Sequence, residues 1–331
     1  MLTILVTGII VVAGYFQWSS NQRVEDSERF IITLGEGVST VARNLVDAGI
    51  VSEPYSFILW SYQREYTASL KAGEYEIEPG TTLLKLLEKF VEGDVVTYSV
   101  TFIEGWTFRQ FLHQLNANGK LEHTLGRLSD KEIMAELRYP DLHPEGRFFP
   151  DTYIFDSNAR DMEVLRQAFE RMSAVLQREW DQRNPRATLK NKYEALILAS
   201  IIEKEAGKRE EMETISAVFY NRLRKKMRLQ TDPTVIYGLG DQFDGNLKRS
   251  HLKRDTLYNT YTRFGLPPTP IANPGVSAIR AALNPLDTDV LYFVSRGDGS
   301  HQFSVTLAEH HRAVETYQLG GRKKPVSSSS E

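Results

Sequence analysis

The residues best suited to chemistry lie in one apolar stretch, ALILASIIEKEAG, from Ala195 to Gly207. Read at about 100° per residue, its leucines and isoleucines point in nearly every direction, which predicts a helix buried on most sides. Glu203 lies within it, and burial raises the pKa of a carboxyl group towards the range where it donates a proton at neutral pH. Residues three and four positions away are all small, which leaves space for a substrate: Ala199, Ser200, Ala206 and Gly207.

Two interpretations of Glu203 are open at this point. It is a catalytic acid, or it is a structural buried carboxylate held by an arginine, and the pattern favours neither. Glu205, two positions on, points to another side of the helix and lies next to Lys208 and Arg209 in the sequence. We therefore expect Glu205 to be a salt-bridged carboxylate rather than the partner of a catalytic pair.

Composition excludes several classes of chemistry. The chain has 331 residues, enough for two or three domains, and its net charge of -3 argues against a nucleic-acid-binding surface. It has no cysteine, which excludes thiolate nucleophiles, disulfides and zinc–thiolate sites. The one close histidine pair, His310 and His311, diverges on a helix, so no metal-ligand spacing is present. We expect no metal and no cofactor, and chemistry from carboxylates, hydroxyls and amides.

The N-terminus predicts a membrane anchor. Residues 2–18 are uncharged and apolar, near the lower limit of about 17–25 residues for a spanning helix. Tyr15, Phe16 and Trp18 match the aromatic belt of a membrane interface. A cleaved signal peptide is the alternative, but no small-x-small cleavage site follows. We expect an uncleaved transmembrane anchor over residues 1–20, a linker over 21–29, and export of the long C-terminal part.

A pattern of short strand, glycine turn, Ser/Thr cap and amphipathic helix then occurs three times. The predicted strands are 32–34, 75–77 and 100–102, each followed by its helix. This cadence over residues 30–122 resembles LysM-type glycan-binding modules, and a small α+β spacer without ligand affinity is equally compatible with it. Over residues 123–144 we expect a connecting helix with a capping box, and the PDLHP turn that ends this segment is the predicted domain boundary.

Rigid strings of polar and aromatic residues mark the region 145–319. They are EGRFFPDTYIF, MRLQTDPTVIYGLG, YNTY and GLPPTPIANPG. Such strings suit carbohydrate binding, which needs many hydrogen bonds and flat faces for sugar rings. The candidate substrate-binding residues are Glu145, Asp151, Gln230, Asp232, Thr234, Tyr237, Tyr258, Asn259, Tyr261 and Asn273.

Three features near these strings have structural explanations. Asp232 begins Asp-Pro-Thr, a typical helix N-terminus. The basic run 222–226 predicts a solvated helix end. Residues 290–294 and 302–305 predict a hairpin, after which a last capped helix and a disordered tail from residue 320 are expected.

Taken together, several strings resemble the endolytic murein transglycosylases, the YceG-like family of membrane-anchored lytic enzymes. They are ASIIEKEAG, FYNRL, MRLQTDPTVIYGLG, YNTY, GLPPTPIANPG and HQFSVTLAEH, and they occur in family order. The resemblance runs from the predicted anchor to about Val314. The sequence departs from the family pattern at Arg147, Leu257 and Thr269, which concerns the detail of the subsites.

The resemblance implies an α+β fold: an N-terminal membrane helix, LysM-like modules, and a mixed α+β catalytic domain around a buried catalytic helix. It implies a protein of the bacterial plasma membrane, with this domain on the outer side. The implied partners are peptidoglycan glycan strands and peptidoglycan synthases (penicillin-binding proteins), with the membrane bound through the N-terminal helix and no nucleic acid.

The implied reaction cleaves the β-1,4 bond between N-acetylmuramic acid and N-acetylglucosamine without water. The resemblance places the family's catalytic glutamate on Glu203. One carboxylate suffices because the muramyl 6-hydroxyl is an internal nucleophile, so Glu203 protonates the leaving oxygen and then takes the hydroxyl proton, leaving a 1,6-anhydro end. Two alternatives stay open: a hydrolase with Asp151 or Asp232 as second carboxylate, and a non-catalytic peptidoglycan-binding scaffold.

Overall fold

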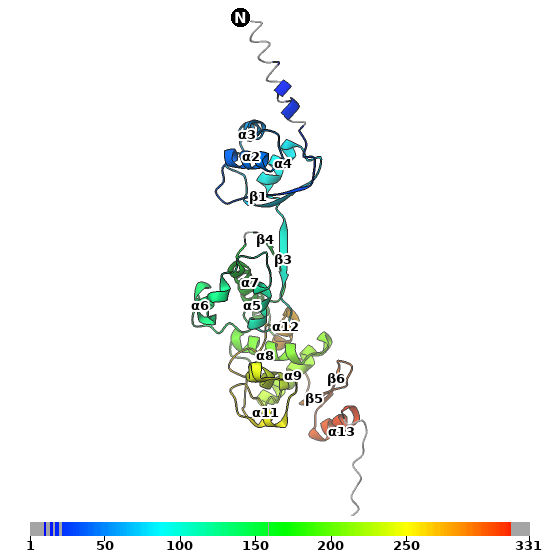
Figure 1. Ribbon diagram of the computed structural model, residues 1–331. Coiled ribbons are helices and arrows are strands. Elements are labelled where there is room, and N and C mark those ends of the chain that lie inside the picture. Colours follow the sequence, from blue (N-terminus) through cyan, green and yellow to red (C-terminus); the bar gives the residue numbers. More distant parts are fainter. Residues whose placement is uncertain (1–9, 11–13, 16, 20–21, 158, 319–331) are drawn as a thin grey trace, which may run out of the picture. The chain divides into compact units, whose positions relative to one another are not determined.

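The computed structural model describes residues 10, 14–15, 17–19, 22–157 and 159–318, which form short strands and many helices (Figure 1). The chain divides into two compact units. The N-terminal unit holds the residues up to Ser99 with two later returns, 119–122 and 154–160, and the C-terminal unit holds the rest. The predicted anchor and tail lie largely outside the described residues. In the described part, none of the helices combines the length and apolar character that a bilayer crossing requires.

The N-terminal unit is built on a two-stranded antiparallel sheet. Its elements are β1 (Glu28–Ile32), α2 (Val38–Asp47), α3 (Pro54–Gln63), β2 (Gly73–Ile77) and α4 (Leu83–Glu92). The register pairs Phe30 with Tyr75, and both rings contact Phe90 of α4, with centroids 5.8 Å and 4.6 Å away. The second predicted strand and the helices that follow both strands are confirmed, but the first strand ends at Ile32, where the predicted strand 32–34 begins.

The third predicted repeat belongs mostly to the C-terminal unit. Its strand, β3 (Thr97–Thr101), pairs with β4 (Thr152–Asp156), and its helix, α5 (Phe108–Asn116), lies in the C-terminal unit. The Phe102 ring stacks on Phe111 at 4.1 Å, within that unit. The division therefore falls near residue 99, whereas the sequence predicted a boundary at 140–144. The reason is that α5 buries its apolar face against residues distant in the sequence.

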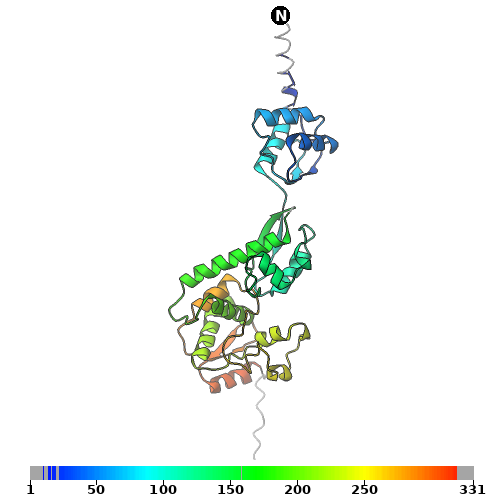
Figure 2. The same ribbon diagram turned by 90° about the vertical axis from the view of Figure 1, so that its left-hand side faces the viewer.

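The C-terminal unit is mainly helical (Figures 1 and 2), and α7 is the long green helix of Figure 2. Its further elements are η1 (Leu125–Arg127), α6 (Asp130–Glu136), α7 (Asp161–Asp181), α8 (Lys192–Glu205), η2 (Arg209–Glu211), α9 (Met212–Arg224), α10 (Asp232–Leu239), η3 (Gly240–Gln242), α11 (Arg249–Lys253), α12 (Val276–Leu283), β5 (Tyr292–Ser295), β6 (His301–Ser304) and α13 (Leu307–Tyr317). The predicted hairpin is confirmed as the antiparallel pair of β5 and β6. The predicted capping boxes of α6 and α13 are also confirmed.

Helix α8 is the core of this unit. Every residue from Ala195 to Ile202 is buried, as the sequence predicted, and α8 contacts α7, α9, α10 and α12. Each fully buried leucine or isoleucine contributes about 1.5–3 kcal/mol relative to an exposed one. The one polar side chain in this stretch, Ser200, donates to the Ile197 carbonyl at 2.7 Å and accepts from the Ile271 amide at 3.0 Å. Ser200 thereby ties the proline-rich segment 265–275 to α8.

We predict that Ser200→Ala lowers the free energy of unfolding by about 1–3 kcal/mol, because it leaves the buried Ile271 N–H without an acceptor. Ser216→Ala is the matched control, since the buried Ser216 hydroxyl has no hydrogen-bond partner among the described residues. This control should be neutral or slightly stabilising. Urea unfolding of both variants gives the comparison, and equal losses would show that the bond to Ile271 contributes nothing.

Candidate active site

A polar cavity of about 460 Å³ in the C-terminal unit brings together side chains from distant parts of the sequence. It is lined by Glu205, Arg222, Leu229, Gln230, Asp232, Tyr261, Phe293, Val294, Ser295, His301, His310, Val314 and Gln318. The end of α8, helix α9, the LQTD string, the YNTY string and the β5–β6 hairpin all contribute. Of the predicted binding residues, Gln230, Asp232 and Tyr261 meet here. Because it combines ionisable groups with an aromatic face, this cavity is the candidate active site.

Glu205 is the carboxylate of α8 that faces this cavity. Burial raises the pKa of Glu205, and the nearby Asp232 charge raises it further. The Thr231 hydroxyl donates a hydrogen bond to the Glu205 carboxylate, and this bond lowers the pKa, as do the charges of His301 and Arg222. A half-buried carboxyl group with a raised pKa, at the wall of a polar cavity, can act as a proton donor.

The predicted salt bridge of Glu205 is wrong. Lys208 Nζ lies 3.6 Å from Asp298, and Arg209 Nη2 lies 2.8 Å from Glu104. The reason is that α8 ends at Glu205 and the next residue is extended, with a ψ of 114°. The following basic residues therefore do not continue the helix, and helical spacing does not apply to them.

Arg222 is buried, whereas the sequence predicted that it would lie at a solvated helix end. It is 8% exposed, and its guanidinium donates to the carbonyls of Leu291 and Leu229, at 2.7 Å and 2.8 Å. It also lies over the Tyr292 ring, 5.2 Å from the centroid. The buried positive charge faces the cavity and favours an ionised Glu205. The sequence did not predict the burial of Arg222, because the other cations of its basic run, Arg224, Lys225 and Lys226, are exposed.

The residues around the start of α10 form the opposite wall. The Tyr261 hydroxyl donates a hydrogen bond to Asp232 at 2.6 Å. Gln230 has a positive φ of 51°, which costs a residue with a side chain about 1 kcal/mol, and its amide donates to the Thr260 carbonyl at 3.2 Å. The LQTD and YNTY strings are thus bonded to each other. The exposed Gln230 side chain lines the cavity, where its Oε1 accepts a hydrogen bond from Arg222 at 3.5 Å.

Two predicted amide ligands hold the framework together instead of facing the cavity. Asn259 donates to three backbone carbonyls within residues 251–254, at 2.7–3.2 Å. Asn273 accepts from the Phe148 amide and donates to the Trp106 carbonyl, both at 3.1 Å. Both side chains are fully buried. Their side-chain atoms are already used by the protein, so we do not assign them to substrate.

Thr234 and Asp151 also lie away from the cavity. The buried Thr234 hydroxyl bonds to the Thr231 carbonyl at 2.8 Å and to the Thr260 hydroxyl at 2.9 Å. Asp151 pairs with Arg171 at 2.5 Å. Both side chains already have partners within the protein, so we do not assign them to substrate.

Glu203, the predicted catalytic acid, lies on another side of α8. Its carboxylate accepts a hydrogen bond from the Gly275 amide at 2.9 Å, at the start of α12. Burial raises the pKa of Glu203, the Gly275 amide lowers it, and the Glu104 charge raises it. Glu203 does not line this cavity, and its catalytic role stays a prediction.

Glu145 forms a separate buried site with two tyrosines. It is 4% exposed, and accepts from the Phe108 amide at 2.9 Å and the Tyr237 hydroxyl at 3.1 Å. The Tyr237 ring contacts Tyr258 edge-on, with centroids 4.9 Å apart. Burial raises the pKa of Glu145 to about 7, against the lowering effect of both hydrogen bonds. Within the described residues, no three His, Asp or Glu side chains gather as a metal site requires.

The profile of the YceG-like family matches residues 30–316. The chain belongs to the YceG-like family. This YceG-like chain is 31% identical over 337 residues to a Bacillus subtilis protein named endolytic murein transglycosylase, with 93% of this chain and 91% of the relative covered.

A second relative and a solved structure agree with this family. The endolytic murein transglycosylase of Streptococcus pneumoniae D39 is 27% identical over 318 residues, covering 85% of the YceG-like chain. The alignment covers 56% of that longer relative. A crystal structure of a YceG-like protein from Listeria monocytogenes has a TM-score of 0.56 and 30% identity, covering 87% of this chain and 98% of that one.

We predict that Glu145 makes the free energy of unfolding pH-dependent. Its pKa in the folded protein, about 7, exceeds its ordinary value of 4.5, so the folded state binds the extra proton between these values. Its stabilising contribution is complete below pH 4.5 and is lost as the pH rises through 7. Glu145→Gln should remove this dependence, which gives the variant a relative gain on the order of 3 kcal/mol from pH 4.5 to pH 8.

Urea unfolding at several pH values measures this difference. Glu210→Gln, at an exposed position in η2, is the control and should follow the wild-type profile. Parallel profiles for wild type and Glu145→Gln would contradict the prediction.

Proposed function

We propose that this protein is an endolytic lytic transglycosylase of peptidoglycan, cutting the β-1,4 bond between N-acetylmuramic acid and N-acetylglucosamine within glycan strands. The Bacillus subtilis relative of that name aligns over nearly its whole length, which supports this activity. The observation that carries the proposal is the position of Glu205, whose carboxyl group lies at the wall of the cavity beside polar and aromatic side chains.

The proposal moves the acid from Glu203 to Glu205. Glu205 lines the cavity together with Gln230 and Tyr261, whereas Glu203 bonds to the start of α12. A general acid must reach the oxygen that it protonates, at about 2.6–3.2 Å in a productive complex. Only a carboxylate at the cavity wall meets this requirement for a substrate bound there.

The reaction follows from one carboxyl group and one internal nucleophile. Protonated Glu205 gives its proton to the glycosidic oxygen as the bond from that oxygen to C1 of the muramyl ring breaks. The 6-hydroxyl oxygen of the same ring bonds to C1, and its proton passes to the Glu205 carboxylate. The 1,6-anhydro ring forms and the acid is restored. Arg222 and His301 favour the ionised carboxylate that exists between the two proton transfers.

A hydrolase is the second candidate, because Asp232 lies in the same cavity. Asp232 accepts a hydrogen bond from the Tyr261 hydroxyl at 2.6 Å. For hydrolysis it would have to activate a water molecule or attack the sugar. In the lytic reaction Asp232 needs only to raise the pKa of Glu205, as it does in this structure.

We predict that Glu205→Gln reduces release of anhydro-muropeptides from purified sacculi by a factor of about 10²–10⁴, the usual contribution of general acid–base catalysis. The amide keeps the side-chain shape, so the melting temperature should not fall. Glu203→Gln is the matched control on the same helix and should keep most of the activity. Turnover and melting temperature are measured on the same samples.

Other outcomes of these measurements would indicate a different acid or a different function. A folded, inactive Glu203→Gln with an active Glu205→Gln would return the acid to Glu203. Reducing ends in the mass spectrum, in place of anhydro ends, would indicate hydrolysis. Sacculi left intact by the wild type would favour the scaffold.

We also propose that the N-terminal part keeps the enzyme close to its substrate. Residues 1–20 would anchor it in the plasma membrane with the C-terminal unit outside, which the apolar run supports. The N-terminal unit would bind glycan as LysM-like modules do, and its β1, α2, α3, β2 order supports this. Tyr55 and Tyr62 of α3 are 72% and 67% exposed and offer flat faces for sugar rings. Peptidoglycan synthases, which make such strands, are the proposed partners.

Deleting residues 1–20 should move the protein from the membrane fraction to the soluble fraction while it still co-sediments with purified sacculi. Replacing Tyr55 and Tyr62 together by alanine should then weaken co-sedimentation several-fold, because stacking on each sugar is lost. Tyr98→Phe in the same unit is the control. Recovery of the truncated protein in the membrane fraction would contradict the proposed anchor. Unchanged co-sedimentation of the double tyrosine variant would contradict glycan binding through these two side chains.

A further inference from the structure

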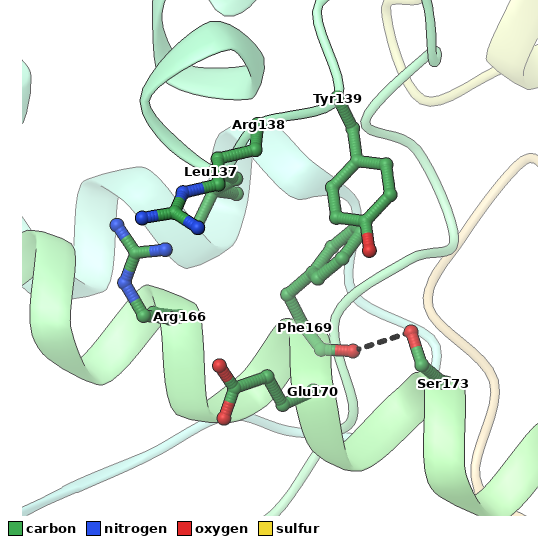
Figure 3. A pocket seen from close by; sticks show the side chains of 7 residues that line it. All are labelled: Leu137, Arg138, Tyr139, Arg166, Phe169, Glu170 and Ser173. Carbon is green, nitrogen blue, oxygen red and sulfur yellow. Dashed lines mark hydrogen bonds between the residues drawn. The ribbon is translucent and has the colours of Figure 1, made fainter.

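A second cavity, of about 580 Å³, lies in the C-terminal unit and shares no lining residue with the candidate active site. It is formed by the segment after α6 and one face of α7 (Figure 3). Its lining residues are Leu137, Arg138, Tyr139, Arg166, Phe169, Glu170 and Ser173. The proposed catalytic steps use none of them.

Two guanidinium groups converge on one part of this cavity. Figure 3 shows the side chains of Arg138 and Arg166 reaching the same region from different elements. Arg166 donates to the Glu136 carbonyl at 3.0 Å, and in the described part of the chain neither arginine forms an ion pair. Two like charges held together repel, and a carboxylate bound between them would relieve this with paired hydrogen bonds.

The backbone of Arg138 has a conformation that favours glycine. Its φ is 72°, and it follows α6 in a Schellman motif: its amide donates to the Ala135 carbonyl and the Tyr139 amide to the Met134 carbonyl, both at 2.8 Å. A side chain at such a position costs about 1 kcal/mol. Lys226, after α9, has the same motif and a φ of 53°, so the strain alone does not identify a site. Arg138 differs because its charge meets a second guanidinium in a cavity.

The rest of the lining indicates what kind of anion fits. The Glu170 carboxylate lies below the arginines in Figure 3 and would attract an amine. The Tyr139 ring is 47% exposed and packs 5.0 Å from Phe169, which offers an apolar face. A ligand that combines a carboxylate, an amine and short aliphatic groups complements all three features, whereas a peptide-free glycan strand carries the lactyl carboxylate of its muramyl residues but no amine.

We propose that this cavity binds the stem peptide of peptidoglycan, with a peptide carboxylate between Arg138 and Arg166 and a side-chain amine towards Glu170. The identity of the peptide rests on the proposed function, because stem peptides are attached to the strands that the enzyme would cut. The cavity volume lies within the range of about 300–1,000 Å³ typical of small-ligand sites. Inorganic phosphate would satisfy the arginines but would face the Glu170 carboxylate, so it should bind less well.

Isothermal titration calorimetry of the full-length protein with the synthetic stem peptide L-Ala-γ-D-Glu-L-Lys-D-Ala tests the site. Arg138→Gly removes one guanidinium and suits the positive φ, so it should weaken peptide binding at least about tenfold without lowering the melting temperature. Lys226→Gly is the matched control: it removes one positive charge from the same backbone motif but lies outside this cavity. Its peptide affinity should equal that of the wild type.

Three results of the peptide titrations would overturn the proposal. They are no detectable binding to the wild type, equal affinity for wild type and Arg138→Gly, and equal weakening by both glycine variants, which would indicate unspecific charge attraction. Inorganic phosphate that binds as tightly as the peptide would make the cavity a general anion site and overturn the peptide assignment.

Cleavage assays separate this proposal from the enzymatic one. Arg138→Gly should cut peptide-free glycan strands as fast as the wild type and peptide-bearing strands several-fold more slowly. Equal rates on both substrates would overturn a role for the cavity in strand recognition. If the wild type cuts neither substrate, the proposed function fails while the calorimetry still decides whether the peptide binds.

Discussion

The burial of α8 on nearly all sides is the constraint on which the C-terminal unit depends. Four helices pack against it, and the proline-rich segment is bonded to it through Ser200. A helix enclosed in this way reaches solvent only at its ends. Glu205 is its last residue, so its carboxylate reaches a cavity while its backbone is still held by the core. The position of the proposed acid is thus set by hydrophobic packing.

Much of the fold could be predicted from periodicity and capping residues. The buried character of α8, the β5–β6 hairpin and the capped ends of α6 and α13 are all local properties of the sequence. The partner of β3 could not be predicted in this way. Its strand–helix pattern matches that of the N-terminal unit, but the Phe108 ring of α5 stacks on Phe148, which is far along the chain.

The sequence predicted which polar strings surround a cavity more accurately than it predicted what each of their side chains does. The polar strings do surround a cavity, but angular position around α8 does not reveal which side faces it. Glu203 and Glu205 both sit among apolar residues, and only tertiary packing distinguishes them. Asn259 and Asn273 show the same limit, because an amide that could bind a sugar serves equally well to hold a loop. The burial of Arg222 was not predicted, because its sequence neighbours are basic residues typical of a solvated helix end.

The interrupted chain path of the N-terminal unit has a consequence for how such genes exchange parts. Its residues up to Ser99 are completed by 119–122 and 154–160, which are encoded inside the sequence of the other unit. A single recombination event near codon 99 would therefore transfer an incomplete unit and separate β3 from the β4 sequence with which it pairs. Lineages that carry this architecture should inherit both units as one cassette, in contrast to modules strung on linkers, which shuffle freely.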